Sequence, residues 1–154
     1  MSEVFFTADT HFGHANIIDY CARPFAAVEE MNSGLIERWN SVVAPADTVW
    51  HLGDVGMGQL ARFAPCVTKL NGTKHLIAGN HDTVWPGNRG AHRVQRDWLE
   101  FFDTVQAFAR LRIAGQRVML SHFPYQGDHT ESDRYLDYRL PDTGAWLLHG
   151  HVHT

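Results

Sequence analysis

The sequence lacks the features that would place it in a membrane or in an oxidising compartment. No apolar run approaches the roughly 20 residues that a membrane-spanning helix needs. The start of the chain, Met1 to Val4, has neither the basic residues nor the apolar stretch of a secretion signal. Cys21 and Cys66 are isolated rather than paired in a CxxC motif, which is typical of free thiols in a reducing environment. We therefore expect a cytoplasmic protein that does not bind a membrane.

Positive charge is also scarce. The 154 residues include 13 Lys and Arg against 17 Asp and Glu, a formal net charge of −4, so the overall field does not attract nucleic acid and stable nucleic-acid binding is not expected. A local site can still bind a nucleotide when metal ions make it positive. No repeat or Ser/Gly-rich linker divides the chain, and its length suits one domain over residues 1–154. The sequence sets no expectation for the oligomeric state.

Histidine, in contrast, is abundant. The chain has 11 histidines, about three times what average composition gives for this length. Histidine is the most common metal ligand and the usual acid–base residue near neutral pH. The number alone indicates nothing, but the positions of these residues relative to the predicted strands are informative.

Hydrophobic patterns predict alternating strands and helices in the first half of the chain. Short apolar runs indicate strands, and apolar residues at helical spacing indicate helices. Pro65 predicts an early end or a kink in the second helix. The alternation favours parallel βαβ units. The predicted strands cover residues 4–8, 48–52 and 74–78, and the predicted helices cover about 26–43 and 59–67.

The second half has a more antiparallel pattern. We expect a short helix over 98–105 and then a β-hairpin, whose strands run over 105–113 and 117–121 around a glycine turn. A polar loop rich in Asp, Tyr and Arg follows His122, and a last strand covers 146–149.

Polar side chains follow the carboxyl end of nearly every predicted strand. Because α/β proteins bind their ligands beyond the carboxyl ends of the strands, we expect these side chains to lie close together. They are Asp9 and His11 after the first strand, Asp54 after the second, Asn80, His81 and Asp82 after the third, His122 after the hairpin, and His151 and His153 after the last strand.

Each cluster taken alone has an ordinary structural explanation. A DxH pair, a Gly-Asp pair or an isolated histidine is more often a turn or a satisfied core residue than a metal ligand. A GNHD segment also suits an Asx turn that caps a helix. The closing GHxH segment is more specific, because alternate residues of an extended segment point to the same side and suit two neighbouring metal ions.

In this order, the motifs DxH, GD, GNHD, a lone His and GHxH resemble the calcineurin-like metallophosphoesterase superfamily, and the resemblance covers essentially the whole chain. The resemblance implies an α/β fold, a two-layer αββα sandwich with a dinuclear metal centre at the strand ends. Carried over by motif, it implies that Asp9, His11 and His153 hold one metal ion, that Asn80, His122 and His151 hold the other, and that Asp54 bridges both.

The resemblance also implies the chemistry. Mixed nitrogen and oxygen ligands suit Mn²⁺, Fe, Zn, Ni or Co better than Mg or Ca, and we expect two ions, with Mn²⁺ first among them. A hydroxide that bridges the two ions would hydrolyse phosphodiester or phosphomonoester bonds, with phosphodiesters favoured. The resemblance places His81 near the leaving-group oxygen, and Asp82 would hold that imidazole in the required tautomer.

Substrate selection is predicted to depend on the loop from Phe123 to Arg139. The expected substrate is a small phosphorylated molecule such as a nucleotide or a cyclic nucleotide. For each residue of the loop taken singly, a solvated polar surface is an equally good explanation. The candidate contacts are Tyr125, His129, Arg134, Tyr135 and Arg139 in the loop and His14 beside the first motif.

Two other interpretations remain open. Relatives usually continue beyond the GHxH motif, whereas only Thr154 follows His153. We therefore expect an incomplete second sheet, in either a minimal family member or a truncated form with impaired activity. The alternative function is a non-catalytic binding or scaffold protein on the same fold. Such proteins typically lose ligands, and this sequence keeps a residue of the right type at every motif position, which favours the enzyme.

Overall fold

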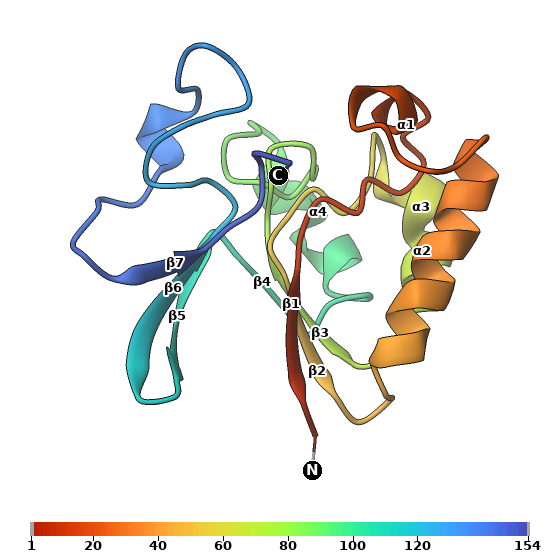
Figure 1. Cartoon of the computed structure of the whole chain (residues 1–154), viewed down its shortest axis with the longest axis horizontal. Coiled ribbons are helices and arrows are strands. Elements are labelled where there is room, and N and C mark those ends of the chain that lie inside the picture. The colour runs from red at the N-terminus through yellow and green to blue at the C-terminus, as the bar shows by residue number, and fades with distance from the viewer. Residues whose placement is uncertain (1, 154) are drawn as a thin grey trace.

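The computed structural model describes residues 2–153 and contains two β-sheets packed face to face (Figure 1). The larger sheet is parallel, and its strands lie in chain order: β1 (Val4–Thr7), β2 (Thr48–His51), β3 (Thr73–Ile77) and β4 (Thr104–Gln106). The smaller sheet contains β5 (Phe108–Ile113), β6 (Gln116–Ser121) and β7 (Trp146–Leu148). In it, β5 and β6 are antiparallel, and β7 lies parallel to β6. The predicted α/β fold with two sheets is confirmed.

The register of the larger sheet places the ends of its first three strands side by side. Thr7 pairs with His51, and His51 pairs with Leu76. Parallel pairing sends all three chains in the same direction, so the segments that follow β1, β2 and β3 meet at one edge of the sheet. This is the edge at which parallel sheets bind their ligands.

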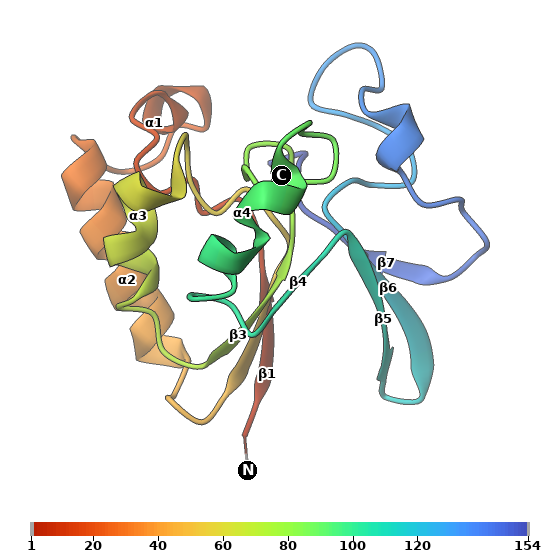
Figure 2. The same ribbon diagram turned by 180° about the vertical axis from the view of Figure 1, so that it is seen from behind.

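Helices lie on the side of the larger sheet that faces away from the smaller sheet (Figures 1 and 2). Phe63 and Trp98 come from two of these helices and pack edge to face at 6.0 Å in a core that includes Leu76 from β3. Burying such large apolar side chains is the main source of stability on this side. The helices are α1 (Asn16–Tyr20), α2 (Val28–Val42), α3 (Leu60–Val67) and α4 (Ala91–Trp98).

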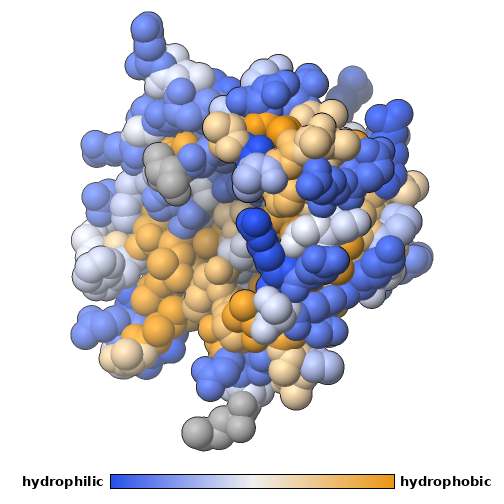
Figure 3. Space-filling view, turned by 45° about the vertical axis from the view of Figure 1, so that its right-hand side comes forward, coloured by the Kyte–Doolittle hydropathy of each residue, from blue (hydrophilic) through white to orange (hydrophobic). Residues whose placement is uncertain are grey.

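A second, smaller core lies between the two sheets. Leu52 and Ile77 of the larger sheet pack with Val118 and Leu120 of the smaller sheet, and all four are buried. The side chains around them are only partly buried, so this core is open along part of its length. Figure 3 shows a broad apolar patch on the molecular surface. Within residues 2–153, the outer face of the smaller sheet carries no α-helix.

The prediction for residues 98–105 was wrong. The helix lies one to two turns earlier, as α4, and the chain then turns into the short strand β4. Trp98, Phe102 and Val105 have helical spacing because a turn brings them into the same core, not because a helix continues. The predicted strand over 105–113 is also divided, since β4 belongs to the larger sheet and β5 to the smaller sheet.

Two short elements had no sequence prediction. They are α1 and a 3₁₀ helix at Leu136–Tyr138. Pro65 lies inside α3, which continues to Val67, so the predicted early end does not occur. None of the described helices combines the length and the apolar character needed to cross a membrane.

Candidate metal centre

The segments after β1 and β2 run side by side beyond the ends of the strands. The backbone N–H of Asp9 donates to the carbonyl oxygen of Gly53 at 2.9 Å, and that of His11 donates to the carbonyl of Asp54 at 3.0 Å. Phe12 and Gly56 form a further parallel bridge. These bonds place the DxH and GD motifs next to each other, although they are far apart in the sequence.

The backbone in these motifs is strained. Five of the seven predicted metal ligands have positive φ values, a conformation that non-glycine residues rarely adopt and that costs about 1–3 kcal/mol per residue. The left-handed turns direct successive polar side chains to a common point. The five are Asp9 (φ 54°), His11 (53°), Asp54 (56°), His151 (73°) and His153 (56°).

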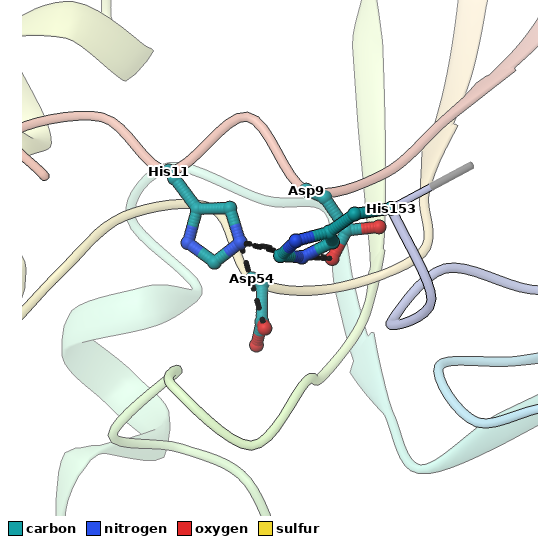
Figure 4. A group of neighbouring side chains, drawn as sticks. All are labelled: Asp9, His11, Asp54 and His153. Carbon is teal, nitrogen blue, oxygen red and sulfur yellow. Dashed lines mark hydrogen bonds and ion pairs between the residues drawn. The ribbon is translucent and has the colours of Figure 1, made fainter. Parts of the chain in front are cut away.

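Asp9, His11, Asp54 and His153 form a compact cluster (Figure 4). Each offers one ligand atom, and these atoms all lie within 4.8 Å of one another. The Nε2 atom of His153 lies 3.2 Å from that of His11 and 3.3 Å from Asp9 Oδ1. Two imidazole nitrogens and two carboxylates facing one point match the chemistry of a divalent transition-metal site.

His122 lies on the other side of Asp54. Its Nε2 atom is 3.4 Å from Asp54 Oδ2, and its Nδ1 atom donates to the carbonyl of Leu52 at 2.7 Å. That bond fixes the ring so that Nε2 faces the Asp54 carboxylate, and loss of the Nε2 proton would leave the tautomer that a metal ligand needs. Burial opposes a charge on His122, but the Asp54 carboxylate has the larger combined effect and raises the pKa of His122 to about 9.

Several polar atoms in this region are buried and have no hydrogen-bond partner within the described residues. A buried polar atom without a partner costs about 1–3 kcal/mol, and native structures contain few of them. A cation bound beside Asp54 would give two of these atoms, Asn80 Oδ1 and His122 Nε2, a partner, so the residues present fit a metal centre. Burial lowers the pKa of His11 to about 3, which keeps that imidazole neutral and able to ligate. The unpartnered atoms include His11 Nδ1, Asn80 Oδ1 and His122 Nε2.

His151 is held differently from the other predicted ligands. Its backbone N–H donates to Asp9 Oδ2 at 3.0 Å, while its Nε2 atom lies 3.1 Å from Asp128 Oδ2. Its ring centroid is 5.3 Å from that of His122. The structure therefore brings His151 to the centre but pairs it with an aspartate that the sequence did not single out.

The Asp128 side chain is fully buried and accepts hydrogen bonds from several side chains. Arg134 Nη2 donates to its Oδ1 at 2.9 Å, and Arg139 Nη2 donates to its Oδ2 at 3.4 Å. Burial opposes ionisation of this carboxyl, but the hydrogen bonds from Arg134 and His151 hold its pKa well below the usual range. Asp128, His129 and His151 also have the spacing of metal ligands. A guanidinium nitrogen of Arg134 lies 2.9 Å from both Asp128 and His129, so a cation already occupies this position.

The glycines of three motifs are required by close packing. A Cβ atom on Gly79 would overlap the Asp54 carboxylate. One on Gly150 would lie 2.6 Å from Asp9 Oδ2, and one on Gly53 would lie 2.6 Å from His122 Nδ1. Real Cβ atoms do not approach heavy atoms this closely. Each glycine thus lets the backbone of one motif pack against the ligand of another.

His81 and Asp82 are adjacent in the sequence but occupy different environments. The His81 side chain is 39% exposed, and its Nε2 atom lies 4.0 Å from Asp54 Oδ2. The predicted contact between Asp82 and the His81 imidazole does not occur. The Asp82 carboxylate instead accepts hydrogen bonds from the backbone N–H groups of Gly79, Asp54 and Val55 at 2.8–2.9 Å. Both of its oxygens are used in holding the turn, so Asp82 supports the backbone of the site.

The cluster of Asp9, His11, Asp54 and His153 lies beside a cavity of about 590 Å³, which His11, Asp54 and His153 help to line. Among the predicted substrate contacts, His14, His129, Arg134 and Tyr135 line it. Tyr125 and Arg139 are not among the residues that line it. The remaining lining residues include Ile17, Tyr20 and Cys21 of the α1 region, Met57, and the motif residues His11, Asp54, Asn80, His81, His151 and His153.

Tyr125 and Arg139 serve the loop itself. The Tyr125 hydroxyl donates to the carbonyl of Ala145 at 3.1 Å, and the residue lines a separate hollow beside β7. The Arg139 side chain is only 4% exposed and donates to the backbone carbonyls of Arg134 and Gly127. Their hydrogen-bonding groups are therefore engaged inside the protein.

This fold and this set of converging ligands define a metallophosphoesterase. A profile of the calcineurin-like phosphoesterase superfamily domain matches residues 3–154, so the chain belongs to that superfamily of metal-dependent phosphoesterases. The resemblance seen in the sequence motifs is confirmed.

Related chains come from phages, archaea and bacteria. The chain is 41% identical to the Gene 66 protein of Mycobacterium phage L5, over 100% of this chain and 79% of that protein. It is 34% identical to the uncharacterized protein MJ1445 of Methanocaldococcus jannaschii, over 99% and 70% of the two chains. Among solved structures, the protein of unknown function AQ665 from Aquifex aeolicus has a TM-score of 0.66 and 28% identity, covering 88% of this chain and 67% of that one.

Proposed function

We propose that this protein hydrolyses small phosphoesters at a centre that holds two metal ions, and that it favours phosphodiesters such as cyclic nucleotides over phosphomonoesters. The observation that carries the proposal is the position of Asp54 between two groups of ligands. Its Oδ2 atom is 3.8 Å from His11 Nε2 on one side and 3.4 Å from His122 Nε2 on the other. One carboxylate between two sets of imidazoles suits a pair of neighbouring ions rather than a single one.

The proposed ligand sets follow from these positions. One ion would be held by Asp9, His11 and His153, and Asp54 would contribute to both ions. The second ion would be held by Asn80, His122 and His151. Bound divalent ions supply Lewis acidity, which lowers the pKa of water and stabilises negative charge on a phosphate. We propose Mn²⁺ for both positions, because the donors mix nitrogen and oxygen.

His81 is the proposed proton donor to the leaving group. Its side chain is partly exposed in the cavity, and its Nε2 atom lies 4.0 Å from Asp54 Oδ2. The backbone N–H of His81 donates to Asp54 Oδ1 at 2.9 Å, which ties the position of the imidazole to the centre of the site. From there, Nε2 would deliver a proton to the departing oxygen, a contribution of about 10²–10⁴ in rate for a well-placed acid.

Arg134 is the proposed ligand for a phosphate oxygen. It is the only lysine or arginine among the described residues that line the cavity beside the candidate metal ligands. Its Nε and Nη2 atoms are bound to Asp128, whereas its Nη1 atom makes no hydrogen bond within residues 2–153. One guanidinium matches the single negative charge of a phosphodiester better than the two charges of a monoester, and this supports the proposed preference.

Hydrolysis assays with metal analysis test the proposal. The purified protein is analysed for metals and assayed with bis-p-nitrophenyl phosphate and p-nitrophenyl phosphate in the presence of Mn²⁺. We expect about two ions per chain and faster turnover of the diester. The enzyme proposal fails if neither ester is hydrolysed. Bound metal without turnover would instead favour a non-catalytic binding protein on this fold.

A further inference from the structure

We propose that Ile17, Tyr20 and Met57 form a nucleobase-binding wall and that Tyr20 selects substrates in which the phosphodiester carries a nucleoside. We call these three residues the apolar wall. The inference rests on the phosphoesterase activity proposed above and adds the residues that would recognise the nucleoside attached to the phosphate.

The two sides of the cavity differ in character. Arg134 and His129 lie on the side formed by the loop after β6, where charge and polar atoms predominate. The apolar wall forms part of the remaining lining, with Tyr20 at the end of α1. Sites that bind small molecules combine apolar and aromatic surface with a few well-placed polar groups. A substrate with a charged phosphate and a flat apolar ring fits both parts of this cavity.

Tyr20 is unusually exposed for an aromatic residue that lines a cavity. It is 73% exposed, whereas Ile17 on the same helix is 3% exposed and anchors the helix in the protein. The intramolecular aromatic contact of Tyr20 is an edge contact with His14 at 6.2 Å, so much of its ring remains free to stack. Proteins that bind single-stranded nucleic acids of any nucleotide sequence stack the bases on exposed aromatic side chains of this kind.

The wall lies close to the proposed metal ligands. The ring of His14 is 6.2 Å from that of Tyr20 and 5.4 Å from that of His11. Only one side chain therefore separates Tyr20 from the cluster. If the phosphate lies at the cluster and the base stacks on Tyr20, the sugar that joins them would lie over the His14 ring.

Hydrogen bonds hold the wall in a defined position relative to the ligands. The backbone N–H of Met57 donates to the carbonyl of Phe12 at 3.0 Å. After α1, Arg23 donates from its two terminal nitrogens to the carbonyls of Thr10 and Asp9 at 2.8 and 2.7 Å. The wall is thus tied to the backbone that carries Asp9 and His11, and such preorganisation lowers the cost of binding.

A base fits the wall better than an acyl chain or a second sugar. The side chains of the wall offer a π-face and a polarisable thioether, which suit a flat heteroaromatic ring. A sugar would need several hydrogen-bonding groups, and none of the three side chains except the Tyr20 hydroxyl provides one. An acyl chain would need a longer apolar channel than these residues make.

Two esters with the same leaving group test the proposal. We would measure kcat/KM for the p-nitrophenyl ester of thymidine 5′-phosphate and for methyl p-nitrophenyl phosphate, in the wild type and in Tyr20→Ala and Tyr20→Phe. Stacking predicts that Tyr20→Ala lowers kcat/KM for the nucleoside ester by about 5- to 150-fold and leaves the methyl ester unchanged. Tyr20→Phe should retain most of the activity. Trp146→Ala, an equally exposed aromatic residue outside this cavity, is the control.

A binding measurement separates this proposal from the proposed activity. Calorimetric titration of the Mn²⁺-loaded protein with adenosine 5′-monophosphate and with ribose 5-phosphate should show tighter binding of the nucleotide, and Tyr20→Ala should remove the difference. Equal affinity of the wild type for the two ligands would overturn the base-binding role even if both esters are hydrolysed. If neither ester is hydrolysed but the protein still binds the nucleotide more tightly in a way that depends on Tyr20, the proposed activity is overturned and the base-binding role stands.

Discussion

The carboxylate of Asp82 accepts a hydrogen bond from the backbone N–H of Asp54, which lies 28 residues earlier in the chain, at 2.9 Å. Val55 and Gly79 donate to the same carboxylate. One buried side chain therefore joins the turn after β2 to the turn after β3. Because Asp54 stands between the two proposed metal sites, the conformation of the whole centre depends on this link.

Replacing Asp82 with Asn should weaken both the fold and the centre. An amide group keeps one acceptor oxygen but presents a donor to a backbone N–H that needs an acceptor, which costs about 1–3 kcal/mol. We expect a lower Tm in thermal unfolding and reduced metal content by elemental analysis. Asp97→Asn, on the exposed side of α4, is the matched control. Unchanged stability and metal content in the Asp82 variant would contradict the structural role of this carboxylate.

The ligand assignment predicts distinct metal contents for three variants. Asp54→Ala should lose both ions, because this residue contributes to both positions. His153→Ala should lose mainly the ion held with Asp9 and His11. His81→Ala should keep both ions and lose about 10²–10⁴ in kcat. Metal analysis after gel filtration, combined with diester hydrolysis, measures all three, and full activity of both Asp54→Ala and His81→Ala would refute the assignment.

Arg134→Lys should raise KM for a diester more than it lowers kcat. Lysine keeps the positive charge but cannot bind Asp128 with two nitrogens while presenting a third to the substrate. Arg134→Gln should have a larger effect because the charge is lost as well. Steady-state kinetics with bis-p-nitrophenyl phosphate would distinguish these cases. Arg112, exposed on β5, provides an Arg→Lys control away from the cavity.

Gly150→Ala should disturb Asp9 while the fold remains. The added Cβ would lie 2.6 Å from Asp9 Oδ2 and 2.7 Å from the Cβ atom of Ala8, so the β1 segment or the GHxH segment must shift. We expect one ion per chain to be lost or bound much more weakly. Gly90→Ala is the control for space, because a Cβ there would contact nothing within 4 Å and Gly90 has a negative φ of −98°. Equal metal affinity in the two variants would show that the site tolerates the shift.

Asp47 should give stability that depends on pH. Its carboxylate accepts the backbone N–H groups of Glu3 at 2.8 Å and Ala44 at 2.7 Å, and these hydrogen bonds lower its pKa. A carboxyl whose folded pKa lies below its unfolded value of about 3.9 contributes stability above that pH, and the contribution is lost as the pH falls through the folded value. Asp47→Asn should therefore be less stable than the wild type near pH 7, with a smaller difference near pH 3.

Denaturant unfolding at the two pH values measures this effect. Glu37→Gln, at an exposed position of α2, controls for the loss of one negative charge. Asp47→Asn and the wild type will differ in their free energy of unfolding. If that difference is the same at both pH values, the carboxylate charge is not involved.

The sequence predicted the strands and the meeting of the motifs because both depend on local patterns. Short apolar runs marked β1, β2 and β3, and parallel pairing then brings their carboxyl ends to one edge. The prediction of a helix at 98–105 was wrong because Trp98 ends α4, and Phe102 lies in the following turn, where packing into the same core mimics helical spacing.

Asp128 shows what the sequence could not reveal. It lies in a polar loop that has no regular pattern of apolar residues, and its partner His151 is 23 residues further along the chain. Its importance comes from complete burial of its side chain beside Arg134 and Arg139, which only the tertiary structure determines. Likewise, Tyr125 and Arg139 had the right chemistry for substrate contacts, but their neighbours use their hydrogen-bonding groups.

The contact between His11 and His153 also has a consequence for biosynthesis. These residues are 142 positions apart, and their Nε2 atoms lie 3.2 Å from each other. During translation, His11 leaves the ribosome long before His153 is added, so the cluster cannot assemble until His153 has emerged. The larger sheet can pair its strands in the order of their synthesis, but metal capture must wait for the final histidines. A ribosome stalled before residue 151 would carry a chain with no complete site for either ion.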